Sequence, residues 1–320
     1  MALGRQLWVV ANAIVDLVAK VDQWPERGGD VLARTGGAFA GGNGFNVAAA
    51  AARLGMKTLY AGLVGTGPMG TAVQRALREA GVALAREPVA GADTGFDCVI
   101  VEPDGERTFI TVPGCESRFG WEHLQALAVP SGDAVYVSGY HLARESSAWA
   151  LIRWLDSLPS GVQVVWDPGP LIAGIAPDIW RQMAARVSVL TVNQREAAWM
   201  TAESDPPHQL ARLRQWCAPG ATVLVRAGAA GTWIFDETSQ QSCRVGTRPA
   251  QAVDTTGAGD VHTGALVALW RPQALVTVVK AANVAASLAV EHLGPHWSPT
   301  WAEVAAYLSD DERIQLASQP

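Results

Sequence analysis

Short runs of β-forming residues alternate along the chain with amphipathic stretches, and this alternation restricts the fold more than any other sequence feature. Glycine follows two of the stretches, 44–54 and 71–80, as it commonly does at helix ends. Alternating strands and helices form a mainly parallel sheet covered by helices on both faces, which binds ligands at the carboxyl ends of its strands. The expected strands are 7–13, 58–64, 134–138, 162–166, 187–192, 222–227 and 232–235.

Two regions interrupt the alternation, at about 15–39 and 94–112, and we expect them to form a small accessory β sheet, or lid. Within the second region, Asp-Gly stands between two runs of β-forming residues, 94–101 and 107–112, which predicts a hairpin. An exposed lid has edges to protect, so two lids could pair in a homodimer. No repeat or linker divides the sequence, which predicts a single domain over 1–320.

Composition narrows the class of ligand and the compartment. The 320 residues carry a net charge of -6 and a pI near 5.5, which argues against binding to nucleic acid or an anionic membrane and favours a small molecule. Cys98, Cys115, Cys217 and Cys243 are widely spaced and form no C-x-x-C pair, so we expect reduced thiols and a cytoplasmic protein. No transmembrane helix is predicted.

The segment Asp254-Thr-Thr-Gly-Ala-Gly-Asp260 precedes an apolar stretch with helical spacing. A small-residue loop that opens a helix exposes backbone N–H groups at the positive end of the helix dipole, so Gly257, Ala258 and Gly259 could bind phosphate oxygens. Asp260 adds a negative charge beside that site, which suggests that it accepts a proton from an attacking hydroxyl. A helix cap is the alternative role for this aspartate.

This segment resembles the carboxy-terminal signature of the ribokinase/PfkB-type carbohydrate and nucleoside kinases. Further matches occur in family order between Asp16 and Ser298: Gly41–Asn46 is similar to the Gly-Gly signature, Asn193–Glu196 to the Asn-x-x-Glu element, Gly228–Gly231 to the glycine turn, and Ala281–Asn283 to the last nucleotide region. The resemblance implies an α/β, ribokinase-like three-layer fold with a β lid. It also implies ATP-dependent phosphorylation of a primary hydroxyl of a sugar or nucleoside.

The resemblance also assigns roles to residues. The positions that would hold the sugar or nucleoside are Asp16, Gly42, Asn43 and Asn46. Those near the ATP are Asn193, Arg226, Gly228, Gly231 and Asn283, although Arg226 could equally form a salt bridge. Glu196 would order Mg²⁺ through water. A K⁺ site would use the Asp254 side chain and the backbones of Thr256, Ala289, His292 and Gly294, with Ser298 nearby.

Three positions depart from the family pattern. Ile14 and Asn43 stand where kinases of free ribose carry Asn and Lys, which favours a nucleoside or modified sugar over ribose. Gly67 replaces an expected Asp. A non-catalytic ligand-binding or regulatory protein on the same fold is the alternative function, and the retention of Asp260 argues against it.

Overall fold

A nine-stranded sheet forms the centre of the protein, in the order β13-β12-β11-β10-β9-β8-β1-β4-β5. The computed structural model describes residues 5–236, 240–294 and 297–317. Neighbouring strands are parallel except at β12, which runs antiparallel to β11 and β13. The strands are β1 (Gln6–Val10), β4 (Lys57–Tyr60), β5 (Ala83–Leu84), β8 (Ala134–Ser138), β9 (Gln163–Asp167), β10 (Val189–Asn193), β11 (Thr222–Arg226), β12 (Thr232–Asp236) and β13 (Gln241–Val245).

Helices cover both faces of this sheet. Alternate residues of the buried strands enter two apolar clusters, so Tyr136 packs in the cluster with α1, α8 and α9, whereas Val135 and Val137 pack in the cluster with α4 to α7. The fold is therefore the expected three-layer α/β arrangement. The helices are α1 (Asn43–Arg53), α2 (Pro68–Glu79), α3 (Trp121–Leu124), α4 (Glu145–Ser157), α5 (Pro177–Ala184), α6 (Gln194–Thr201), α7 (Pro206–Arg214), α8 (Ala258–Ala268), α9 (Leu275–Ala289), α10 (Trp301–Ala305) and α11 (Asp310–Ala317).

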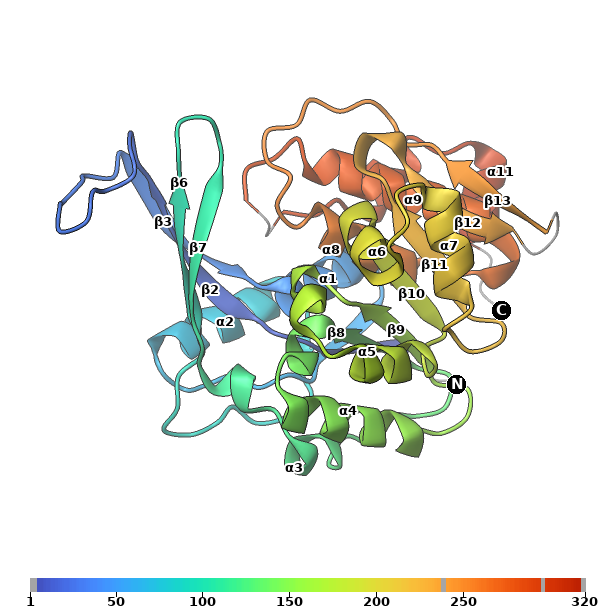
Figure 1. Cartoon of the computed structure of the whole chain (residues 1–320), viewed down its shortest axis with the longest axis horizontal. Coiled ribbons are helices and arrows are strands. Elements are labelled where there is room, and N and C mark those ends of the chain that lie inside the picture. The colour runs from blue at the N-terminus through green and yellow to red at the C-terminus, as the bar shows by residue number, and fades with distance from the viewer. Residues whose placement is uncertain (1–4, 237–239, 295–296, 318–320) are drawn as a thin grey trace.

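A second sheet stands out from one side of the molecule (Figure 1). Its four strands, β3 (Thr35–Gly41), β2 (Ile14–Lys20), β6 (Phe96–Val101) and β7 (Arg107–Val112), are ordered β3-β2-β6-β7. The β2–β6 pair is parallel and the outer pairs are antiparallel. This sheet is the expected β lid, and its edge strand β7 exposes Phe109 and Ile110.

Within the described residues, no single helix has both the length and the apolar character to cross a membrane. The segments Ala258–Ala268 and Pro272–Ala289 meet that requirement only as a pair, which is bent by 120°.

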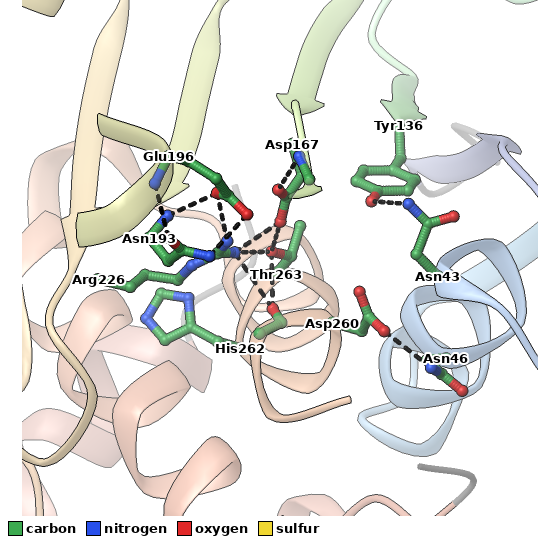
Figure 2. A network of polar contacts seen from close by, with 12 residues as sticks. Asn43, Asn46, Tyr136, Asp167, Asn193, Glu196, Arg226, Asp260, His262 and Thr263 are labelled. Atoms are coloured by element: carbon green, nitrogen blue, oxygen red, sulfur yellow. Dashed lines mark hydrogen bonds and ion pairs between the residues drawn. The ribbon is translucent and has the colours of Figure 1, made fainter. Parts of the chain in front are cut away.

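The carboxyl ends of three central strands meet at one edge of the large sheet. Asp167, Asn193 and Arg226 are the last residues of β9, β10 and β11, and Asn193 is paired in register with Arg226. Because parallel strands end at the same edge, these polar side chains lie together near the first turn of α8 (Figure 2).

Candidate active site

A buried arginine connects the strand ends to α8. The Arg226 Nη1 atom donates to Asp167 Oδ2 at 2.6 Å and to Thr263 Oγ1 at 2.9 Å, and its Nη2 lies 3.7 Å from Glu196 Oε2. Burial disfavours the guanidinium charge, but the nearby Asp167 and Glu196 carboxylates outweigh it and raise the pKa of Arg226. We call Asp167, Glu196, Arg226 and Thr263 the arginine network.

Asn193 and Glu196 begin α6 with a reciprocal capping box. The Glu196 amide donates to Asn193 Oδ1 at 2.9 Å, and the Asn193 amide donates to Glu196 Oε2 at 2.8 Å. Burial and the nearby Asp167 carboxylate raise the pKa of Glu196 to about 7, although Arg226 opposes them. Both carboxylate oxygens of Glu196 already accept hydrogen bonds from Asn193. This arrangement suits contact with Mg²⁺ through water better than direct ligation.

The N-terminus of α8 opens into the same region. Gly257 is its N-cap with φ 76°, a conformation that favours glycine, and it provides no side-chain cap for the first amides. The Ala258 amide donates to Thr255 O at 3.3 Å, whereas the amides of Gly257 and Gly259 find no acceptor within the described chain. These groups and the helix dipole fit an anion such as a nucleotide phosphate, which supports part of the predicted anion hole.

Asp260 lies in the first turn of α8 and faces α1. Its Oδ2 accepts a hydrogen bond of 2.7 Å from Asn46 Nδ2 (Figure 2). The two helices approach closely because position 264 is glycine, where a Cβ would lie 2.7 Å from Val47 O. Burial raises the pKa of Asp260 to about 6, with Asp167 adding to the rise and the Asn46 hydrogen bond opposing it. This carboxyl group is mostly ionised at neutral pH and can accept a proton.

A polar cavity of about 220 Å³ lies between α1, the lid and the turn after β8. Asn12, Asn43 and Asp97 line it, and each has a buried side-chain oxygen without a hydrogen-bond partner in the described structure. The Asn46 Oδ1 is unpartnered in the same way. Buried oxygens that lack donors are costly, so this cavity suits a ligand rich in hydroxyl donors.

Asp16 lies on β2 and is 7% exposed. Burial raises its pKa to about 7, and the carboxylates of Asp97 and Asp260 add to the rise while Arg107 opposes it. Asp97, which is paired in register with Asp16, and Asp260 therefore both disfavour the charged form of Asp16. Of the other residues expected to hold the sugar or nucleoside, Gly42 is the N-cap of α1, and Asn43 Nδ2 donates to Tyr136 Oη at 3.4 Å.

The remaining residues expected near ATP lie beyond the arginine network. Gly228 and Gly231 form the tight turn between β11 and β12, and a Cβ at Gly231 would lie 2.1 Å from Val245 O. The Asn283 side chain on α9 accepts from Thr232 Oγ1 at 2.7 Å and donates to Val245 O at 2.9 Å. This side chain joins α9 to β12 and β13, so any nucleotide contact would be indirect.

The residues expected around K⁺ surround Asp254. Its Oδ1 accepts from the Thr256 amide at 2.9 Å and its Oδ2 from the Gly294 amide at 2.8 Å. The Ala289 carbonyl accepts from the His292 amide at 3.0 Å, and Ser298 Oγ is buried without a partner among the described residues. Asp254 Oδ2 also pairs with the Arg107 guanidinium at 2.5 Å, so a cationic group already contacts the carboxylate expected to bind K⁺.

The sequence-based prediction lacks several residues of the site, among them Asp167, Asp97 and Arg107. Asp167 comes directly after the apolar run 162–166, and this position at the end of an expected strand could have marked it as a site residue. Asp97 and Arg107 lie on lid strands whose pairing brings them to the site. No local pattern marks them, because their function depends on contacts with residues far along the chain.

Comparison with known proteins agrees with this geometry. Residues 5–301 match the pfkB family of carbohydrate kinases. The uncharacterized sugar kinase YegV of Escherichia coli is 30% identical over 303 residues, which cover 94% of this chain and 93% of that protein. The family assignment and the fold therefore rest on nearly the whole chain.

Two solved structures share the fold. Ribokinase of Arabidopsis thaliana complexed with ribose and ATP has a TM-score of 0.76 and 24% identity, with 99% of this chain and 100% of that chain covered. Aminoimidazole riboside kinase of Salmonella enterica, complexed with aminoimidazole riboside and an ATP analogue, has a TM-score of 0.78 and 21% identity over 95% and 100% of the two chains.

The chain belongs to the pfkB family of carbohydrate kinases. It is an ATP-dependent phosphotransferase whose acceptor is a hydroxyl group of a sugar or nucleoside. This catalytic function replaces the alternative of a non-catalytic binding protein.

Proposed function

We propose that Asp260 is the general base of this kinase and that the polar cavity holds the phosphate acceptor. The observation that carries this proposal is the Asp260 carboxylate in the first turn of α8, beside the amides of Gly257 and Gly259 and held by Asn46 at 2.7 Å. Its pKa of about 6 leaves it ionised near neutral pH but close enough to titrate, as suits a general base.

The reaction follows from this arrangement. Asp260 accepts the proton of a primary hydroxyl as the hydroxyl oxygen forms a bond to the γ-phosphorus. Bound ATP supplies the phosphoryl group, and the bond to its β-phosphate oxygen breaks to release ADP. The amides of Gly257 and Gly259, with partial help from Ala258, stabilise the negative charge that develops on the transferred group.

The acceptor would be a polyhydroxylated molecule. Asp16, Asn43 and Asn46 offer oxygens that accept hydrogen bonds, and Gly42 lets the ligand approach the backbone at the start of α1. A sugar or the ribose unit of a nucleoside presents several hydroxyl donors in a small volume, which these oxygens require.

The arginine network would position the nucleotide side. Glu196 would hold Mg²⁺ through water, with Asp167 beside it. Arg226, paired with both carboxylates, positions them and contacts Gly259 O at 3.3 Å on α8. Asn193 caps α6, and the turn of Gly228 and Gly231 would shape the nucleotide surface together with Asn283.

The organisation of the protein is proposed on separate grounds. Cys98, Cys115 and Cys217 are free thiols, which supports a cytoplasmic location. The exposed edge strand β7 supports pairing of two lids in a homodimer of single-domain chains.

A phosphorylation screen tests the function directly. The purified chain is incubated with ATP and Mg²⁺ and a panel of pentoses, hexoses and nucleosides, and ADP release and product mass are measured. We expect at least one acceptor to gain a phosphoryl group on its primary hydroxyl. Phosphorylation of a secondary hydroxyl would refute the proposal. So would the absence of any product, or a product that Asp260→Asn still forms at the wild-type rate.

A further inference from the structure

An arginine of the lid reaches across to the loop that precedes α8. Arg107 is the first residue of β7, and its Nη2 lies 2.5 Å from Asp254 Oδ2 while its Nη1 donates to Thr256 Oγ1 at 2.7 Å. The Arg107 side chain is 20% exposed and that of Asp254 is 2% exposed. Two hydrogen-bonding contacts to one loop give this interaction a defined geometry, unlike that of a typical surface ion pair.

The lid holds Arg107 in a fixed position. Arg107 pairs with Val101 across the β6–β7 hairpin, and the hairpin turn is closed by the hydrogen bond from Gly105 N to Glu102 O at 2.9 Å. A movement of the lid would therefore carry the guanidinium with it. The ion pair forms only when the lid lies close to the loop.

Asp254 organises the loop that leads into the anion-binding turn. It accepts the amides of Thr256 and Gly294, and its own amide donates to Val290 O at 3.1 Å. Burial alone would raise the pKa of Asp254, but these hydrogen bonds and Arg107 outweigh it and lower the pKa. Two backbone donors and one positive charge, that of Arg107, thus keep this buried carboxylate ionised.

We propose that Arg107 is a positioning residue that supplies this positive charge in place of a bound monovalent cation, so that lid closure sets the loop carrying Gly257 and Asp260. Among the described residues, Arg107 is the cation that pairs with Asp254. Burial raises the pKa of Asp16 and the Arg107 charge opposes that rise, so the same guanidinium also acts on a residue of the proposed acceptor side. The inference rests on the proposed roles of Gly257 and Asp260.

The first test compares monovalent cations. Wild type, Arg107→Ala and Arg107→Lys are assayed with the acceptor found in the screen, in KCl and in tetramethylammonium chloride of equal ionic strength. We expect the wild-type kcat in KCl to differ by less than about twofold from that in tetramethylammonium chloride, because both salts screen exposed charges equally. Arg107→Ala should lose at least about tenfold in kcat, the scale of a small misplacement of catalytic groups. Its KM for ATP should change much less.

Rescue separates positioning from general damage. Low concentrations of guanidinium, or K⁺, should restore part of the kcat of Arg107→Ala, and Arg107→Lys should retain more activity than Arg107→Ala. Arg34→Ala is the matched control, because Arg34 also lies in the lid region and pairs with an acidic residue, Asp22, at an exposed site. It should behave as wild type in both salts.

Thermal unfolding of the ligand-free protein gives a readout that needs no acceptor. K⁺ should raise the Tm of Arg107→Ala more than tetramethylammonium does, because the vacated Asp254 can bind it, whereas wild type should not distinguish the salts. A wild-type kcat that requires K⁺, or an Arg107→Ala variant with wild-type kcat, would overturn the inference. Loss of activity in Asp260→Asn but not in Arg107→Ala would leave the proposed function standing and remove this inference alone.

Discussion

The arginine network and the polar cavity differ in how their polar atoms are satisfied. Figure 2 shows Asp260 between the network and Asn43, which lines the cavity. In the network, Arg226 binds Asp167, Thr263 and Gly259 O, so its charges are paired without a ligand. In the cavity, the oxygens of Asn43 and Asp97 lack partners. The nucleotide side is therefore assembled in advance, whereas the acceptor side requires its ligand to complete the hydrogen bonding.

This difference has a consequence for stability. Removing one partner of a buried ion pair strongly destabilises the folded state, because the other charge stays buried without a counter-charge. Removing a buried carboxylate that has no partner should instead stabilise it, because that carboxylate already destabilises the folded state. Substitutions on the two sides should therefore change the free energy of unfolding in opposite directions.

The largest effect is expected for Arg226→Met. Removing the guanidinium leaves Asp167 and Glu196 buried without their counter-charge, which should lower the free energy of unfolding by about 3–5 kcal/mol. Chemical denaturation measures the loss. Arg186→Met is the control, because Arg186 pairs with Asp156 at 2.6 Å on the more exposed surface, and we expect a loss of only about 0–1 kcal/mol. Equal losses in the two variants would show that the network is not preassembled.

Asp260→Asn should lower kcat by about 100-fold or more, the lower end of general-base effects, while leaving ATP binding largely unchanged. Steady-state kinetics and isothermal titration with ATP check both parts. Asp311→Asn, an exposed first-turn aspartate of α11, is the control and should retain wild-type turnover. Near-normal turnover of Asp260→Asn would exclude this residue as the base.

The acceptor preference should be a smaller effect. Ile14 and Asn43 both line the polar cavity, where they provide fewer polar contacts for a free pentose than Asn and Lys would. We expect kcat/KM for at least one nucleoside to exceed that for ribose by about tenfold, which corresponds to about 1.4 kcal/mol. Parallel assays at saturating ATP decide the question, and a tenfold preference for a free sugar would reverse it.

Strong local patterns predicted much of the large sheet. The strand 134–138 has the bounds of β8, and 222–227 and 232–235 differ from β11 and β12 by one residue. The mixed polar sequence of β13 gave no such signal, because this strand is defined by its antiparallel pairing with β12. Strands could be predicted where burial on both faces of the sheet requires a continuous apolar run.

The lid and the site were predicted less completely. The glycine-rich segment 35–41 has little intrinsic strand preference and becomes β3 by pairing with β2, and the parallel β2–β6 pair joins residues such as Val15 and Phe96 that are far apart in sequence. The glycine turn and Asp260 were visible as one short segment. A salt bridge of Arg226 was one of two expected roles, and the structure shows it with Asp167 as the partner. The Arg107–Asp254 pair had no local signal, because tertiary packing creates it.

The most direct test of the difference between the two sides is the pH dependence of stability in Asp16→Asn. The folded pKa of Asp16, about 7, exceeds its unfolded value of about 3.9, so its stabilising contribution is full below about pH 4 and is lost as pH rises through 7. The Tm of the variant minus that of wild type should therefore increase from pH 4 to pH 7 and then level off. We predict a gain of about 2 °C or more at pH 8, which corresponds to about 1 kcal/mol, together with weaker acceptor binding. A pH-independent difference, or a lower Tm at pH 8, would contradict the account.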